Sequence, residues 1–310
     1  MEYRRGARID QSRIRYGGRG GSRMPGGRLP GGRRGGRGMA VGGGMGGVIL
    51  IVLFLLLGGD LGSVLGNVAM GPAGQPAGQV GGSGQGANLE GCQTGADIET
   101  NRDCRWLAYE NSVQNYWADA LKGYEYGSMV LFSGQVATAC GTGSSEMGPF
   151  YCPADETVYI DMGFTGELLE MLGAEGGDAA EAYIVGHEFG HHVSNLTGQM
   201  ADARSTGQDT GPDSAQVRLE LQADCYAGVF FSNTVKDPDS LIESVSRDDL
   251  QRIADAARSV GDDHIQQQQG GRVVPESWTH GSSEMRQRWV TKGFDSGDPR
   301  VCDTFATDDL

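Results

Sequence analysis

The chain has 310 residues and a formal net charge of −15 at pH 7, and this length allows one domain with a substantial core plus appended segments. Residues 1–38 hold eleven arginines against two acidic residues, a net +9, which leaves −24 for the rest of the chain. Because phosphate contacts need Lys and Arg, the acidic remainder argues against a nucleic-acid-binding surface there, and no nucleic acid partner is expected.

The Arg/Gly-rich leader, residues 1–38, precedes the uncharged stretch 39–59, which contains an unbroken apolar run from Val48 to Leu57. About 21 helical residues reach roughly 30 Å, the thickness of the hydrocarbon core of a bilayer. The stretch predicts a single transmembrane anchor, with the N-terminus held in the cytoplasm by the arginines and the rest of the chain outside. A cleaved signal peptide is the alternative for this stretch. RNA binding is the alternative for the leader, but orientation beside a span explains its arginines more simply.

All six cysteines follow the apolar stretch, at Cys92, Cys104, Cys140, Cys152, Cys225 and Cys302. An even number on the exported side of a membrane predicts disulfides. The close spacings favour Cys92 with Cys104 and Cys140 with Cys152, which leaves Cys225 for Cys302 among the 15 pairings that six cysteines allow. A cysteine zinc site is not expected, because the chain has no Cys-x-x-Cys pair.

Residues 60–90 are rich in Gly, Pro, Ser and Gln and lack helical or strand periodicity, so they predict a flexible linker. The folded domain is expected to cover residues 91–310. Apolar periodicity and capping residues predict a mixture of strands and helices. The strands are expected within 128–140 and 150–162, and the helices at 103–123, 163–175, 178–198, 213–236, 247–260 and 282–292. This mixture predicts an α+β fold.

The segment IVGHEFGHHVSN contains two histidines four residues apart, His187 and His191. On a helix both imidazoles stand on one face, which suits two ligands of one tetrahedral zinc ion. Glu188 lies about 100° round the helix, where it can take a proton from water at the open metal position. This His-Glu-x-x-His pattern is the metalloprotease signature. His192 points away from His191 and is expected to pack or to meet solvent.

The next helical segment, RLELQADC, offers a third ligand. Glu220 and Asp224 are again four residues apart and lie on one helical face. Glu220 is expected to bind the metal, and Asp224 is expected to accept the spare ring N–H of a ligand histidine, which fixes the tautomer. Asp224 as the metal ligand is the first alternative. The second is that Glu220 and Asp224 simply form a solvated face of the helix without a function.

The pair HEFGH and ELQAD resembles the gluzincin plan of metallopeptidases. The chain as a whole is similar to the neutral zinc metallopeptidases of bacterial membranes. The likeness rests on the basic leader, the predicted span and three segments, GHEFGHHVSNLTG, RLELQADCYAGVFF and THGSSEMRQRWVTKGFDSGDP. The likeness covers essentially the whole of residues 91–310. It implies a zincin-like domain, one catalytic Zn²⁺, and hydrolysis of peptide bonds in exposed or extended protein segments. It also implies that the strand ETVYIDM, residues 156–162, lies beside bound substrate, with an ordinary core strand as the alternative.

Related membrane gluzincins carry a His followed six residues later by an Arg near the site, and His280 and Arg286 have this spacing. His280 is expected to hydrogen-bond the oxyanion of the tetrahedral intermediate, and Arg286 to pair with a carboxylate of the site. Gly281 stands where the family usually has proline. An ordinary surface helix start is therefore the alternative reading of this segment.

The sequence thus predicts a zinc endopeptidase anchored in a bacterial cell membrane, with its domain outside the cytoplasm and a peptide or protein as its partner. A catalytically silent zinc protein that docks partners at the membrane is the alternative from another class. Glu188 argues against it, because a structural zinc site needs no base. A zinc hydrolase of non-peptide amides is the remaining alternative.

Overall fold

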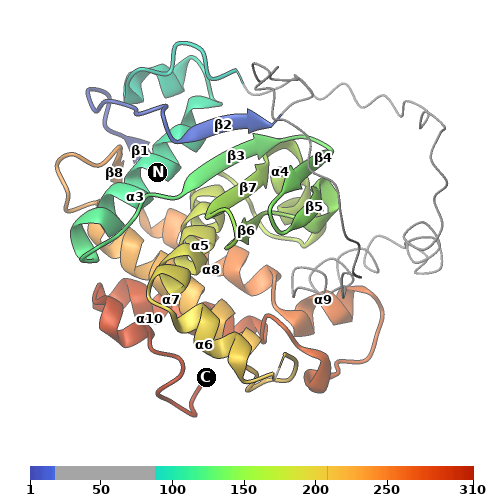
Figure 1. The fold of residues 1–310 in the computed structure, drawn as a ribbon. Coiled ribbons are helices and arrows are strands. Elements are labelled where there is room, and N and C mark those ends of the chain that lie inside the picture. Colours follow the sequence, from blue (N-terminus) through green and yellow to red (C-terminus); the bar gives the residue numbers. More distant parts are fainter. Residues whose placement is uncertain (18–87, 208) are drawn as a thin grey trace, which may run out of the picture.

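The structure, a computed structural model, describes residues 1–17, 88–207 and 209–310. The expected span at 39–59 and nearly all of the expected linker lie outside the described residues. Among the described residues, no helix is both long enough and apolar enough to cross a membrane. Most strands lie in one run, β3 to β7, and most helices follow that run along the chain, so the α+β class is confirmed (Figure 1).

The elements have the following bounds. The strands are β1 (Glu2–Tyr3), β2 (Ile14–Gly17), β3 (Ser128–Phe132), β4 (Gln135–Thr138), β5 (Gly141–Ser144), β6 (Phe150–Cys152), β7 (Thr157–Asp161) and β8 (Ile242–Ser244). The helices are α3 (Cys104–Ala120), α4 (Met162–Met171), α5 (Asp178–Leu196), α6 (Gln199–Ser205), α7 (Ala215–Thr234), α8 (Arg247–Ser259), α9 (Asp262–Gln268) and α10 (Ser283–Ser296). Short 3-10 turns occur at Gly95–Glu99, Ser145–Met147, Pro275–Ser277 and Pro299–Cys302.

A four-stranded sheet with the order β2-β3-β7-β6 forms one layer of the domain (Figure 1). β2 and β7 run parallel to β3, and β6 runs antiparallel to β7. All five residues of β7 are buried. The expectation that this strand offers an edge to substrate is corrected, because β6 covers its open side and is itself the edge of the sheet.

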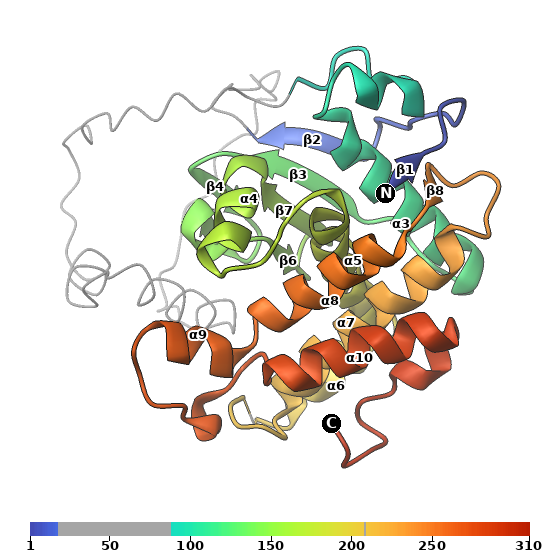
Figure 2. The same cartoon turned by 180° about the vertical axis from the view of Figure 1, so that it is seen from behind.

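The second layer is built from α5, α7 and α10, and Figure 2 shows α10 alongside α7. Small residues let the helices approach closely. A Cβ on Gly190 of α5 would lie 2.9 Å from the Cα of Ala223 in α7, and one on Gly293 of α10 would lie 2.0 Å from the carbonyl oxygen of Cys225. A Cβ atom so close to the backbone of the neighbouring helix would clash with it. These glycines therefore bring the three helices that carry the polar site residues into contact.

Residues 1–17 belong to the folded domain, and we refer to them as the arm. β2 pairs with β3 from Ile14 opposite Met129 to Gly17 opposite Phe132, and β1 pairs antiparallel with β8. The expected division into a separate leader and a domain of residues 91–310 is corrected by this pairing. The arm's strands have only two and four residues, too few for an alternating pattern to stand out among arginines.

The three disulfides join Cys92 to Cys104, Cys140 to Cys152, and Cys225 to Cys302. This is the pairing that the close spacings favour. The second bond ties the end of the β4–β5 hairpin to β6. The third ties α7 to the segment after α10, so it fastens the C-terminal part of the chain to the helix that carries Glu220.

Replacing both Cys225 and Cys302 by alanine is expected to lower the free energy of unfolding by about 4.5 kcal/mol, because this bond spans 77 residues of the unfolded chain. The same exchange at Cys92 and Cys104, which are 12 residues apart, is expected to cost about 3 kcal/mol. All four cysteines are fully buried, so the two double variants lose similar packing. Urea unfolding compares them, and an inverted order would contradict the loop-closure explanation.

Candidate metal centre

Three side chains that could hold a metal ion meet between α5 and α7. The helical period puts His187 and His191 one turn apart on α5, and Glu220 comes from α7. One ligand atom from each residue lies within 4.8 Å of the other two. Nε2 of His187 and Nε2 of His191 lie 3.2 and 3.4 Å from the two carboxylate oxygens of Glu220. The three side chains are 4–12% exposed, so the cluster is shielded from bulk water.

The donor set fits a zinc ion. Two imidazole nitrogens and one carboxylate oxygen are the three protein ligands of an open catalytic site, with a fourth position left for water. Burial would raise the pKa of Glu220, but His191 and His187 hold it well below its usual value. Burial would lower the pKa of His187, but Asp224 and Glu220 raise it to about 9. A charged carboxylate buried beside two imidazoles attracts a cation. A metal ion bound here would replace the proton on Nε2 of His187, the ring nitrogen that faces Glu220.

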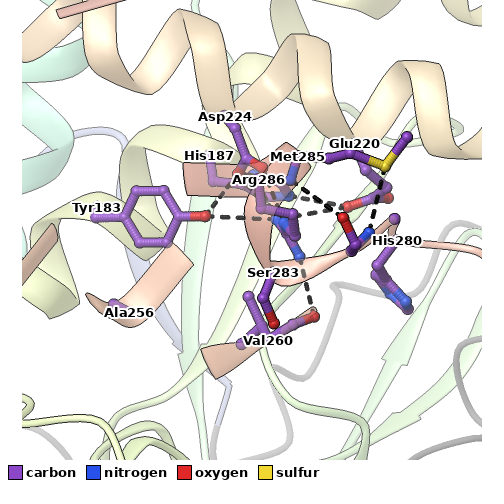
Figure 3. A network of polar contacts seen from close by, with 12 residues as sticks. Tyr183, His187, Glu220, Asp224, Ala256, Val260, His280, Ser283, Met285 and Arg286 are labelled. Atoms are coloured by element: carbon purple, nitrogen blue, oxygen red, sulfur yellow. Dashed lines mark hydrogen bonds and ion pairs between the residues drawn. The ribbon is translucent and has the colours of Figure 1, made fainter. Parts of the chain in front are cut away.

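Asp224 lies one turn after Glu220 on α7 and organises the groups behind the cluster (Figure 3). Its Oδ1 lies 2.8 Å from Nδ1 of His187. With Nε2 of His187 turned to the metal position, Nδ1–H donates to this oxygen, which fixes the tautomer and the ring orientation. Neighbouring positive groups keep the pKa of Asp224 lowered despite its complete burial, chiefly Arg286 and then His187. This geometry is the one proposed for Asp224 from the sequence.

Arg286 reaches the same carboxylate from α10. Its Nε donates to Oδ2 of Asp224 at 2.8 Å and its Nη2 to Oδ1 at 2.9 Å, a two-point contact (Figure 3). Tyr183 adds a third bond, from its Oη to Oδ1 of Asp224 at 2.5 Å. Sequence reasoning missed Tyr183. The available signal was its position four residues before His187, on the same helical face.

Glu188 follows the first ligand on α5 and is 7% exposed. Burial raises its pKa, and the nearby His187 and His191 oppose this rise. Unlike Glu220 and Asp224, its carboxylate accepts no hydrogen bond from the described residues. A carboxylate that is buried, unpaired and close to the metal ligands is suited to accept a proton at neutral pH.

Comparison with known proteins decides the family. Residues 5–305 match the family described as "Putative neutral zinc metallopeptidase". The chain belongs to this family. The match covers the arm from residue 5 onward and the segments that supply the cluster, and it leaves out β1 and the last five residues.

The chain has relatives in several bacteria. It is 49% identical over 230 residues to the protein Rv2575 of Mycobacterium tuberculosis and likewise to Mb2605 of Mycobacterium bovis, which covers 73% of this chain and 78% of each relative. It is 38% identical over 239 residues to YpfJ of Escherichia coli K12, covering 71% of this chain and 81% of the relative. All three relatives are described as uncharacterized proteins. No solved structure matches the chain.

His280 lies on the segment before α10, near enough for its charge to act on Glu220. Its Nδ1 is 3.2 Å from Oδ1 of Asp262, the first residue of α9. Oδ2 of Asp262 accepts the backbone N–H groups of Thr279, His280 and Gly281. Asp262 was missed from the sequence, because only the fold brings it beside a histidine 18 residues away. It fixes the backbone and the ring of His280 together.

Replacing His280 by alanine is expected to lower kcat roughly 10²–10³-fold, the usual cost of losing one oxyanion donor, while zinc content stays unchanged. Asp262→Asn is also expected to lower kcat. An asparagine side chain has only one acceptor oxygen, so it cannot accept the three backbone N–H groups and also the ring N–H of His280. Steady-state kinetics and metal analysis measure both effects. Loss of zinc from His280→Ala would contradict the assignment and make His280 part of the metal set.

His192 takes part in the packing of the domain and does not face the His187–His191–Glu220 cluster. It is fully buried on the other side of α5. Nε2 lies 2.8 Å from the carbonyl oxygen of Glu125, so it carries the proton, and Nδ1 accepts from the hydroxyl of Tyr151 at 2.9 Å. Burial lowers the pKa of His192, which keeps it neutral. The residue therefore joins α5 to the edge strand β6, as the packing alternative at the sequence level predicted.

Proposed function

We propose that this metallopeptidase is a zinc-dependent endopeptidase with a zincin-like domain, working on peptide or protein substrates. The observation that carries the proposal is the convergence of His187, His191 and Glu220 close to Glu188, whose carboxylate has no hydrogen-bond partner among the described residues. A structural zinc site has four protein ligands and needs no neighbouring base. This cluster offers three ligands and one base.

Zinc held by the three side chains would polarise the scissile carbonyl and lower the pKa of a bound water toward neutrality. Glu188 takes a proton from the attacking water as the new C–O bond forms, and passes it to the amine as the C–N bond breaks. His280 donates a hydrogen bond to the oxyanion. Asp224 and Arg286 keep His187 in the required tautomer.

The sheet suggests how a substrate lies. β6 is an edge strand beside α5, and an edge strand exposes backbone N–H and C=O groups that an extended peptide can pair with. This favours unfolded or extended segments over compact surfaces. Backbone pairing also favours a peptide over a non-peptide amide, because a small amide offers no strand to add.

We further propose that the enzyme acts on the outer side of the cytoplasmic membrane, with the uncharged stretch 39–59 attaching it there. Three disulfides support an oxidising compartment, since a reducing cytosol does not maintain such bonds. The length and uncharged character of the stretch support its role as the attachment.

The experiment is cleavage of unfolded casein by the purified full chain, before and after removal of zinc with a chelator and after zinc is added back. Activity that disappears with the metal and returns with it supports the proposal. Bound zinc without cleavage of casein or of a library of unstructured peptides would favour the silent scaffold protein. Cleavage that survives complete removal of metal would contradict the zinc assignment.

A further inference from the structure

The arm, residues 1–17, lies across one edge of the domain in both views (Figures 1 and 2). Besides the strand pairs, its backbone is held along its length. The N–H of Arg4 donates to the carbonyl of Leu241 at 2.8 Å, and the N–H of Ile9 donates to that of Gln93 at 2.9 Å. Ile9 and Ile14 are buried in the main hydrophobic core. The arm is therefore packed as an element of the domain and not as a surface extension.

A buried charge depends on the arm. Glu110 of α3 is fully buried, and Nε of Arg13 donates to its Oε1 at 2.8 Å. The other groups bonded to this carboxylate are the neutral side-chain amides of Asn111 and Gln114. Without the arm, Glu110 would keep its burial and lose its cation, which is an unfavourable state for a carboxylate. The folded domain therefore needs Arg13 to balance the charge of Glu110.

The arm also touches the helix that carries the metal ligands. Oη of Tyr3 donates to Oδ2 of Asp178 at 3.0 Å, and Asp178 is the first residue of α5. Asp178 is further held by ion pairs with Arg102 and Arg105 of the region before and within α3. The start of α5, the helix of His187 and His191, is therefore held partly by Tyr3, which precedes the uncharged stretch in the sequence.

We infer that residues 1–17 are a structural part of the metallopeptidase domain, and that the arm and the metal centre lie on the same side of the membrane. Residues 17 and 88 are the described ends of one connection, and both belong to a single packed body. A cytoplasmic arm with an outer domain, the arrangement expected from the arginines, would separate β2 from β3 and Arg13 from Glu110. The family match supports the inference, because it begins within the arm at residue 5.

Cysteine labelling in spheroplasts that express the full chain tests the sidedness. All six native cysteines are in disulfides, so Ser12→Cys in the arm and Ala201→Cys on α6 each introduce one free thiol at an exposed position. A membrane-impermeant maleimide is expected to label both variants to the same extent before lysis. Labelling of Ala201→Cys before lysis but of Ser12→Cys only after lysis would overturn the inference. Labelling of both only after lysis would support a shared side and contradict the outer location proposed above.

Thermal unfolding of the purified full chain tests the packing independently of location. Arg13→Met is expected to lower Tm by roughly 10 °C, because it leaves Glu110 buried without a cation. Arg15→Met is the matched control, since Arg15 lies two residues after Arg13, within β2, and is exposed, so its loss is expected to leave Tm unchanged. Should Arg13→Met not fold, Arg13→Lys is expected to give a smaller drop. Equal Tm values for wild type, Arg13→Met and Arg15→Met would overturn the inference.

Discussion

The Glu188→Gln variant is expected to keep one zinc ion per chain and to lose about 10²–10⁴-fold in kcat/KM, the contribution of a positioned general base. Glutamine fills the same space next to His187 but accepts no proton. Burial already raises the pKa of Glu188, which brings the carboxylate closer to the working pH of a base. Peptide cleavage assays and metal analysis on the same preparations provide the two measurements.

The control for this variant is Glu284→Gln, an exchange of the same chemistry at an exposed position in the first turn of α10. It is expected to match wild type in both activity and zinc content. If Glu188→Gln cleaves as fast as this control, Glu188 is not the base. If Glu188→Gln also loses its zinc, its defect is structural, and the assay says nothing in favour of base catalysis.

The Asp224→Ala variant is expected to lose about 3–5 kcal/mol of stability, because buried Arg286 loses both hydrogen bonds to Asp224 and keeps only a 3.9 Å contact with the carboxylate of Glu220. Zinc affinity is expected to fall roughly 10–100-fold, since His187 loses the acceptor that fixes its tautomer. Urea unfolding measures the first effect in metal-free protein. Competition with a chelator of known zinc affinity measures the second.

Tyr183→Phe is the matched comparison for Asp224→Ala. It removes one hydrogen bond to the same carboxylate and leaves Arg286 paired, so a loss of about 1 kcal/mol and nearly unchanged zinc affinity are expected. Equal effects from the two variants would mean that the network acts through packing alone. An unaltered zinc affinity in Asp224→Ala would refute its role in orienting His187.

The metal cluster and most helices were accessible from sequence because they depend on local periodicity. Four-residue spacings on one helix place His187 with His191, and Glu220 with Asp224, whatever the rest of the chain does. The same periodicity predicted a helix at 213–236, which appears as α7 at Ala215–Thr234. The disulfide pairs followed from spacing and elimination.

Contacts between distant segments were not accessible in this way. Asp262 meets His280 only because α9 packs against the segment before α10, and Arg13 meets Glu110 across 97 residues. Neither pair has a local pattern that singles it out. The arm was further obscured by its composition, since positive charge next to an apolar stretch is also what orients a membrane anchor. Charge counting and strand pairing thus lead to different domain boundaries, and the pairing is visible only in the fold.

The most direct measurement is anomalous diffraction at the zinc edge from crystals of the purified protein. We expect one strong peak among His187 Nε2, His191 Nε2 and the carboxylate of Glu220, at about 2.0–2.2 Å from each ligand atom, with a fourth position open to water. A peak at any other group of residues, or no peak in protein prepared with zinc, would contradict this expectation.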